Sequence, residues 1–555
     1  MPSLTRGEFA EFATEARSSR PGVTLAIPVG IRLLSDQLTP VLAYRRMVSA
    51  DERAAASFLL ESVEGGDRQA RHSILGARPI IELTAHQNTV RVLDRRAGDE
   101  PTTREAANPV DLIRELTAGV VQVTPPNHVS QGRLPSCVLG GWFGYASYDT
   151  VRHAEPGKLG FEKAPPDDRG LPDLSFAFYD GVVVFDNASK TVHVVSLAMV
   201  GPDDDTDDRL GEVYERTIEA MQARAVELET HSKPLALGRV GRALPVSALP
   251  SNTTRAEHRS MVERALEYIR AGDIFQVVIG QRFERESAAD PFDVYRALRS
   301  VNPSPYMVYM QAPGVILVSA SPEILCRVRH NHGGGGGTDG TSTLTNRPLA
   351  GTRKRGLTKA EDLALEKDLL ADTKETAEHV MLVDLGRNDV GMVAVPGSVS
   401  LDDLMSIERY SHVMHISSTV TGTLREGLDC WDALRATLPV GTISGAPKIR
   451  AMQIIDELEK VRRGPYGGGL GWVSLDGEMD IALALRTIVV PTAMHDGARG
   501  TWMYHIQAAG GIVADSDPDA EFDETVNKAA ALARAVELAE RAFGDSRFGV
   551  QDQGF

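Results

Sequence analysis

A proline-punctuated segment divides the chain and sets the first limit on its architecture. Residues 232–253 are irregular and contain Pro234, Pro245 and Pro250. Immediately afterwards, Thr254 and Glu257 have the spacing of a helix capping box, and Gly272 is typical of a helix end. These signals predict an N-terminal domain over residues 1–235 and a second domain over residues 254–540.

Both parts of the chain mix strands with helices. Short apolar runs predict strands over residues 80–83, 89–93, 181–186 and 191–196, and the last two are spaced as a β-hairpin. After residue 254 the pattern alternates between strand-like and helix-like segments. The glycine-rich, low-complexity stretch 332–345 predicts a flexible surface insertion.

Composition excludes several classes of function. The chain carries 59 Lys and Arg against 76 Asp and Glu, a net charge of −17, which disfavours a general nucleic-acid binder. Its three cysteines, Cys137, Cys326 and Cys430, have neither zinc-ligand spacing nor a disulfide pattern. The N-terminus shows no apolar signal region, and no stretch is apolar enough to span a bilayer. We therefore expect a soluble, reduced, cytoplasmic protein without a membrane partner.

Two pairs of carboxylates stand out in segments of helical character. Glu375 and Glu378 form one pair, Glu521 and Glu524 the other, and spacing i, i+3 puts each pair on one helix face. One interpretation is two solvated helix faces, with Glu524 and Lys528 as an ordinary i, i+4 ion pair. The other is a site of hard oxygen ligands for Mg²⁺, which binds one or two carboxylates together with water and an anionic substrate.

Three glycine-rich turns accompany these helices, at residues 439–448, 463–471 and 508–513. Glycine lets backbone N–H groups approach an anion closely, although each turn alone is explained by a tight hairpin. Arg486 lies in a strand-like run, IALALRTIVV, and Tyr466 lies in the second turn. Together these features favour a pocket for a small polyanion, in which a metal binds one acid group and Arg486 with Tyr466 binds another.

At the level of whole motifs, the sequence resembles the chorismate-utilising enzyme family, and within it the large subunits (component I) of anthranilate synthases. The motifs that carry this resemblance occur in the family's order and include LLES (59–62), GDIFQVV (272–278), NPSPYMVYM (302–310), SPEIL (321–325), PLAGTRKRG (348–356), KETAEHVMLVDLGRNDVG (374–391), VGTISGAPK (440–448), RRGPYGGGLGW (462–472) and DSDPDAEFDETVNK (515–528). The resemblance implies an α+β fold of layered antiparallel β-sheets with helices packed outside, in which the two halves interlock.

The resemblance also implies a reaction, in which chorismate and ammonia give anthranilate and pyruvate. Glu378 and Glu524 would be the principal Mg²⁺ ligands, supported by Glu375 and Glu521, and Glu323 would be the general acid that protonates the departing hydroxyl group. The other residues expected in the site are His415 and Thr442 near the ring carboxylate, Gly351 and Thr352 beside the ring, and Tyr466, Arg486, Ala509, Gly510, Gly511 and Lys528 around the rest of the substrate.

Two positions distinguish members of this family. Relatives that add water carry a lysine where this chain has Gln276, and a lysine can act as a base whereas glutamine cannot, which favours ammonia as the nucleophile. Many aminodeoxychorismate synthases carry a lysine where this chain has Ala350, which favours anthranilate as the product. The alternatives are aminodeoxychorismate synthase component I and a catalytically silent tryptophan-binding paralogue.

The resemblance also implies a regulatory site and a partner subunit. Glu61, Ser62, Pro305, Tyr306 and Met307 match the family's tryptophan-inhibition site, although a packed strand and turn would also explain them. None of the three cysteines lies in a glutaminase-like motif, so ammonia would come from a separate glutamine amidotransferase subunit. We therefore expect a hetero-oligomer that tryptophan inhibits.

Overall fold

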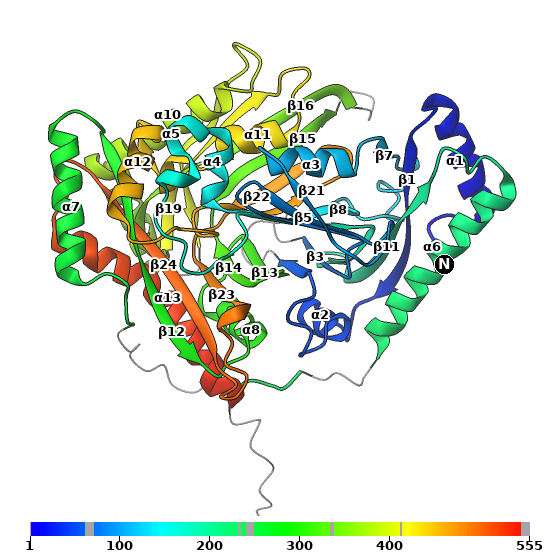
Figure 1. Cartoon of the computed structure of the whole chain (residues 1–555), viewed down its shortest axis with the longest axis horizontal. Coiled ribbons are helices and arrows are strands. Elements are labelled where there is room, and N and C mark those ends of the chain that lie inside the picture. Colours follow the sequence, from blue (N-terminus) through cyan, green and yellow to red (C-terminus); the bar gives the residue numbers. More distant parts are fainter. Residues whose placement is uncertain are drawn as a thin grey trace, which may run out of the picture.

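Two large β-sheets form the framework of the computed structural model, which describes residues 2–61, 71–230, 235–239, 249–332, 338–410 and 413–544. Within those ranges each sheet has 12 strands, and almost every pair of neighbours is antiparallel. In each sheet the strands from before the proline-punctuated segment lie together on one side and those from after it on the other, and one strand pair joins the two groups, so both halves of the chain share each sheet (Figure 1).

The strands of the first sheet are, in spatial order, β20 (Gly445–Ala446), β12 (Gln276–Ser287), β24 (Trp502–Ile512), β23 (Thr487–Pro491), β14 (Val315–Ser321), β13 (Tyr306–Ala312), β2 (Ser57–Glu61), β3 (His72–Ala77), β10 (Gly181–Asp186), β11 (Thr191–Val200), β1 (Thr24–Leu34) and β7 (Val120–Gln122). Those of the second are β17 (Leu349–Lys354), β19 (Val413–Thr423), β16 (Thr338–Arg347), β15 (Ile324–His332), β22 (Met479–Leu483), β21 (Gly469–Val473), β8 (Gly141–Ala146), β9 (Leu174–Tyr179), β4 (Ile81–His86), β5 (Thr89–Asp94) and β6 (Thr102–Glu105), with β18 (Ser400–Arg409) paired to β19.

Helices cover the outer faces of both sheets. The first sheet is covered by α1 (Arg6–Ser19), α2 (Pro40–Met47), α6 (Asp207–Glu229), α8 (Pro291–Val301) and α13 (Pro518–Phe543), and its β12 end also by α7 (Arg255–Arg270) and α12 (Lys448–Leu458). The second sheet is covered by α3 (Pro109–Leu116), α4 (Val151–Ala154), α5 (Pro156–Leu159), α9 (Lys359–Ala371), α10 (Thr373–Gly391) and α11 (Cys430–Thr437). This is the layered α+β fold that the sequence predicted.

The two sheets pack face to face through an aromatic core. Phe58 of β2 stacks on Phe143 of β8, with ring centroids 3.9 Å apart, and Tyr179 of β9 meets both rings edge-on. Aliphatic side chains such as Val308 of β13 and Leu470 of β21 complete this layer. Both halves of the chain contribute to this layer, since the three rings come from the first half and Val308 and Leu470 come from the second.

Several local predictions are confirmed. The predicted strands correspond to β4, β5, β10 and β11, and β10 pairs with β11 as a hairpin. Helix α7 begins after Thr254, whose side chain and that of Glu257 form the reciprocal capping box, and Gly272 follows with φ 82°. The insertion prediction is wrong in part, because residues 338–347 form strand β16, which pairs with β15 and β19; residues 333–337 lie outside the described ranges.

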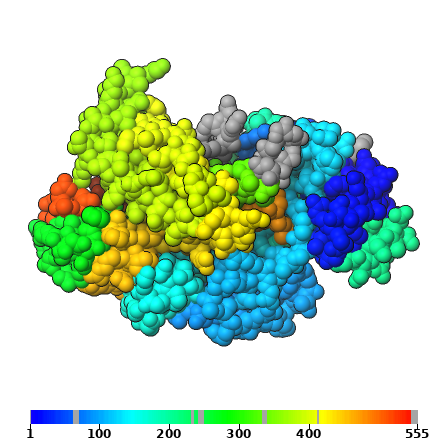
Figure 2. Space-filling model, turned by 90° about the horizontal axis from the view of Figure 1, so that it is seen from above, coloured from blue at the N-terminus to red at the C-terminus, as the bar shows by residue number. Residues whose placement is uncertain are grey.

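The site residues gather where corresponding edges of the two sheets meet. Strands β12 and β24 lie at one edge of the first sheet, while β17 and β19 lie at one edge of the second. In Figure 2 the lime and yellow segment that contains β16–β19, α9 and α10 lies toward the opposite end of the molecule from the blue N-terminal residues. Among the described residues, no helix combines the length and apolarity that a membrane span needs.

Removing one ring from the core between the sheets tests this architecture. We expect Phe58→Ala to lower the free energy of unfolding by about 3–5 kcal/mol, because it leaves a cavity against Phe143 and Tyr179. The measurement is chemical denaturation followed by tryptophan fluorescence. Leu34→Ala is the control, since Leu34 is 80% exposed and its loss should change stability by no more than about 0.5 kcal/mol. Equal effects of the two variants would contradict the packing described.

Candidate functional site

Glu323 is a buried acid between strands β14 and β15. Its side chain is 2% exposed, and Thr442 Oγ1 donates a hydrogen bond of 2.9 Å to its Oε1. Burial raises the pKa of Glu323 to about 8, although the bond from Thr442 and the charge of Arg486 favour the ionised form. The carboxyl group therefore holds its proton at neutral pH and is able to donate it to a ligand.

His415 lies in β19 and is held in its neutral form. Burial, reinforced by the charge of Arg486, lowers the pKa of His415 to about 4. Its Nδ1 lies 2.9 Å from the carbonyl oxygen of Gly351 and 3.1 Å from Thr352 Oγ1. A carbonyl only accepts, so Nδ1 carries the hydrogen and Nε2 accepts from the Arg486 guanidinium at 3.3 Å.

Arg486 does not lie in a strand, contrary to the prediction. It sits in the gap between β22 and β23 with φ 48°, a left-handed conformation that interrupts the strand-like run. The backbone N–H of Ala320 donates to its carbonyl oxygen, which fixes this bend to β14. The departure from strand geometry accompanies the turn of the guanidinium towards His415.

The first carboxylate pair lies on α10, as predicted. The helix begins after Asp372, whose side chain caps the backbone N–H groups of Lys374 and Glu375. Burial and repulsion from Glu375 raise the pKa of Glu378, burial raises the pKa of Glu375, and the charge of Glu524 contributes to both shifts. Carboxylates that resist ionisation in this way would be stabilised by a cation placed between them.

Gln276 connects this pair to the first sheet. Its Nε2 donates to Glu378 Oε1 at 3.2 Å, while its buried Oε1 has no hydrogen-bond partner within the described part of the chain. Gly511 lies directly beside it on β24, where an added Cβ would meet Gln276 Nε2 at 2.7 Å. Glycine at residue 511 therefore leaves the space that the glutamine side chain occupies.

The second carboxylate pair begins α13 but its two members face different surroundings. Glu524 accepts from Lys528 Nζ at 2.7 Å, and Lys528 also donates to the carbonyl oxygen of Ala509 at 2.9 Å. Glu521 is buried against Gly510, and Ser516 Oγ donates to its Oε1 at 2.7 Å. Successive strand residues point to opposite faces of a sheet. Glu521, which lies against Gly510, is therefore on the opposite face of β24 from Gln276, which lies against Gly511.

The residues that the sequence placed in one site are linked by a series of hydrogen bonds, close approaches and charge interactions. Glu323 accepts from Thr442 and interacts with the charge of Arg486. The series continues from Arg486 to His415 and then to Gly351, where an added Cβ would lie 3.1 Å from Glu375 Oε2. It continues through Glu378 to Gln276 and Gly511, and through Glu524 and Lys528 to Ala509. Tyr466 is buried next to the backbone of Ala509.

Whether a metal ion fits this site depends on the arrangement and charge of the four carboxylates. Among the residues described, no group of three or more His, Cys, Asp and Glu side chains forms a closed metal site. The donor set nevertheless suits a hard cation, because the charges of Glu375 and Glu524 raise the pKa of Glu378, and the buried Glu521 Oε2 has no hydrogen-bond partner among the residues that the structure describes. Mg²⁺ binding by these residues stays a prediction.

The residues that match the tryptophan site lie together at the β2–β13 pair. Glu61 is directly opposite Met307, and its buried carboxylate accepts from Tyr295 at 2.6 Å and Arg299 at 3.0 Å. Tyr306 donates to Asp480 at 2.9 Å, and Pro305 precedes it in the turn before β13. Ser62 lies outside the described residues.

Sequence reasoning missed several groups that hold the site in place. Arg353 approaches Glu375 at 3.5 Å, Ser516 holds Glu521, and Lys448 pairs at 2.5 Å with the buried Asp389 of α10. Each of them lies inside a motif that carries the family resemblance, yet none has the pattern of a catalytic group. Arg353 and Lys448 pair with residues of another motif, and Ser516 lies five residues before Glu521 in a segment typical of a turn, so spacing alone gives no signal for them.

The raised pKa of Glu323 predicts a pH dependence of stability. The folded protein binds this proton more tightly than the unfolded chain, so the stabilisation from Glu323 is complete below about pH 4.5 and is lost as the pH rises through about 8. We expect Glu323→Gln to remove this loss, which makes its Tm fall less than that of the wild type between pH 5 and 8. The measurement is the difference between the two Tm–pH curves, and parallel curves would contradict burial of an ionisable Glu323.

Known proteins of one enzyme family resemble this chain in sequence and in fold. The profile of the chorismate binding enzyme family matches residues 57–534. The anthranilate synthase alpha subunit 1, chloroplastic, of Oryza sativa subsp. indica is 50% identical over 94% of this chain and 89% of its own length. Anthranilate synthase component 1 of Pseudomonas aeruginosa is 42% identical over 97% of this chain and 100% of its own. The crystal structure of anthranilate synthase component I from Streptococcus pneumoniae TIGR4 superposes with a TM-score of 0.67 and 32% identity, and the match covers 91% of this chain and 99% of that one. The chain therefore belongs to the chorismate-binding enzyme family.

Proposed function

We propose that the protein is the large subunit of a Mg²⁺-dependent anthranilate synthase, a lyase that converts chorismate and ammonia to anthranilate, pyruvate and water. The observation that carries this proposal is the buried Glu323, which accepts a hydrogen bond from Thr442 and interacts with the charge of Arg486, the residue that also contacts His415. Loss of a hydroxyl group from chorismate requires such an acid, and a carboxyl group with a pKa of about 8 supplies it at neutral pH.

In the first step the nitrogen of ammonia forms a bond to C2 of the ring as the ring double bonds shift and the C4–O bond breaks. Glu323 donates its proton to the departing oxygen, which leaves as water. In the second step the C2 proton is removed, the C3–O bond to the enolpyruvyl group breaks, and protonation of that group gives pyruvate while the ring becomes aromatic. The cationic Arg486 would bind the enolpyruvyl carboxylate.

Gln276 would act on the nucleophile. Its buried Oε1 has no partner among the described residues and accepts hydrogen bonds only, so it would accept one from ammonia. An amide does not remove a proton from water at neutral pH, and this fits a nucleophile that needs no activation. The neutral Ala350 of β17 leaves no amine there to attack the ring.

Glu378 and Glu524 would hold the metal ion, with Glu375 and Glu521 in support. When bound, Mg²⁺ would orient the ring carboxylate and offset its charge. Ammonia would come from a separate glutamine amidotransferase subunit in a hetero-oligomer, which we expect in the cytoplasm.

Tryptophan would inhibit by binding at Glu61, Ser62, Pro305, Tyr306 and Met307. Tyr306 of β13 pairs with Ser321 of β14, whose hydroxyl donates to the carbonyl oxygen of Leu483 at 2.5 Å. Glu323 follows Ser321 by two residues, so a shift of β13 would be transmitted to the acid. Tryptophan would then stabilise a conformation with a displaced Glu323.

The decisive experiment uses the purified chain, chorismate, Mg²⁺ and a high concentration of ammonium at mildly alkaline pH. We expect anthranilate fluorescence that tryptophan suppresses, because the partner would supply only ammonia. Consumption of chorismate without anthranilate would favour an aminodeoxychorismate synthase. Tryptophan binding without any consumption would favour the silent paralogue.

A second prediction concerns the metal. We expect Glu378→Gln to lower kcat by about 100-fold or more and to abolish the rise in Tm on addition of Mg²⁺, because the amide is a much weaker ligand than the carboxylate. Asp384→Asn on the exposed side of the same helix is the matched control and should behave as the wild type. A Mg²⁺-dependent rise in Tm that survives in Glu378→Gln would refute this ligand assignment.

A further inference from the structure

A single buried guanidinium joins three segments that carry site residues. Arg463 is 2% exposed, and its Nη1 donates to the carbonyl oxygen of Ile443 at 2.5 Å. Its Nη2 donates to the carbonyl oxygen of Val278 at 2.7 Å. We propose that Arg463 is a positioning residue for the reaction, holding Thr442, Gln276 and Tyr466 in register; this inference rests on the proposed function.

The contact with Ile443 bears on the general acid. Ile443 follows Thr442 in a short 3₁₀ turn, and Thr442 Oγ1 donates to Glu323. The position of that hydroxyl depends on the backbone of the turn, and the backbone carbonyl next to it is fixed by Arg463. Release of the carbonyl would lengthen the bond to Glu323, which removes a contribution that favours the ionised carboxylate.

The contact with Val278 bears on the other side of the site. Val278 and Gln276 lie on the same face of β12, two residues apart. The backbone N–H of Val278 also donates to the carbonyl oxygen of Ser444 at 2.9 Å. The guanidinium therefore links β12 to the turn that contains Thr442, because it donates to one carbonyl oxygen in each. The planar fork of guanidinium donors allows both bonds at once, and a lysine ammonium does not.

Glu459 fixes the guanidinium in this orientation. It accepts from Arg463 Nε at 2.9 Å and from Nη2 at 2.6 Å, a two-point pairing that sets the plane of the group. Its Oε1 also accepts from the backbone N–H of Gly280 at 2.8 Å. The pair is therefore attached to β12 through Gly280 as well as to the end of α12, and the two side chains neutralise each other.

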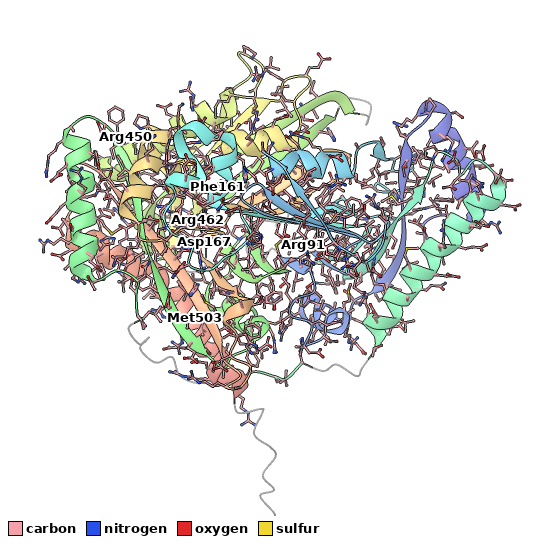
Figure 3. All side chains as sticks on the ribbon, in the orientation of Figure 1. Arg91, Phe161, Asp167, Arg450, Arg462 and Met503 are labelled. Carbon is pink, nitrogen blue, oxygen red and sulfur yellow. The ribbon has the colours of Figure 1, made fainter. Side chains whose placement is uncertain are left out.

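The N-terminal half of the chain supplies further contacts to Arg463 and its neighbours. Tyr148 lies under the Arg463 guanidinium, 4.7 Å from ring centroid to Cζ, and Asp149 accepts from the backbone N–H of Gly464 at 3.0 Å. Figure 3 labels the neighbouring Arg462 close to Phe161 and Asp167, and the Arg462 guanidinium lies 5.0 Å from the Phe161 ring centroid. Residues of the first half therefore support the loop that carries Tyr466.

The test is Arg463→Lys, compared with Arg285→Lys. Arg285 lies on the same strand as Val278 and pairs with Glu537 and Glu540, away from the site. We expect Arg463→Lys to lower kcat about 10- to 100-fold with KM for chorismate within about twofold, the pattern of misplaced reacting groups. Its alkaline limit of activity should move to higher pH, because loss of the bond from Thr442 raises the pKa of Glu323. Arg285→Lys should retain the wild-type kcat and pH profile.

A readout independent of turnover separates this inference from the proposed function. The carboxyl stretch of Glu323, assigned by difference infrared spectra against Glu323→Gln, should titrate at higher pH in Arg463→Lys than in the wild type. An unchanged titration and kcat, or changes equal to those of Arg285→Lys, would overturn the positioning role. A wild type that forms no anthranilate would refute the proposed function, while the titration still decides the role of Arg463. If Arg463→Lys does not fold, the isosteric Glu459→Gln, which weakens the same pair, is expected to shift the titration in the same direction.

Discussion

The exclusion of water from Glu323 is the constraint on which the site depends. A carboxyl group keeps its proton near neutral pH only where the protein withholds the solvation that an anion needs. Here that environment exists because β14 and β15 turn from one sheet into the other at this residue, with cores packed on either side. The acid strength of one side chain is therefore a property of the two-sheet architecture, and the single bond from Thr442 adjusts it.

The same architecture explains why the surrounding polar groups come from so many segments. No local sequence rule encodes the geometry of these groups. The histidine bonds to a backbone carbonyl, the arginine lies in a left-handed bend, and the glutamine lies beside a glycine. They meet only because edges of both sheets converge. Local strain at Arg486 is one cost of this convergence, and such departures concentrate at functional sites.

Much of the fold followed from the sequence. The capping box at Thr254 predicted the start of α7, and the run after Gly181 predicted the β10–β11 hairpin, because both depend on local interactions. The carboxylate pairs lay on helices for the same reason. The interruption at Arg486, the strand within the glycine-rich stretch and the burial of Glu521 behind β24 were not accessible, since each depends on a contact with another element that the local sequence pattern does not specify. The resemblance named the residues expected in the site, and the structure supplied the hydrogen bonds that these residues make.

The sharing of both sheets by the two halves of the chain has a consequence for biosynthesis. Strand β2 has β13 as its neighbour, and β8 has β21, so both sheets remain incomplete until late segments of the chain emerge from the ribosome. Until then the early strands present unpaired edges, which are templates for aggregation. Pairings of such long range also slow folding, because chain entropy is lost before the contacts form. The nascent chain is thus expected to depend on chaperones for longer than a protein of equal size built from sequential domains.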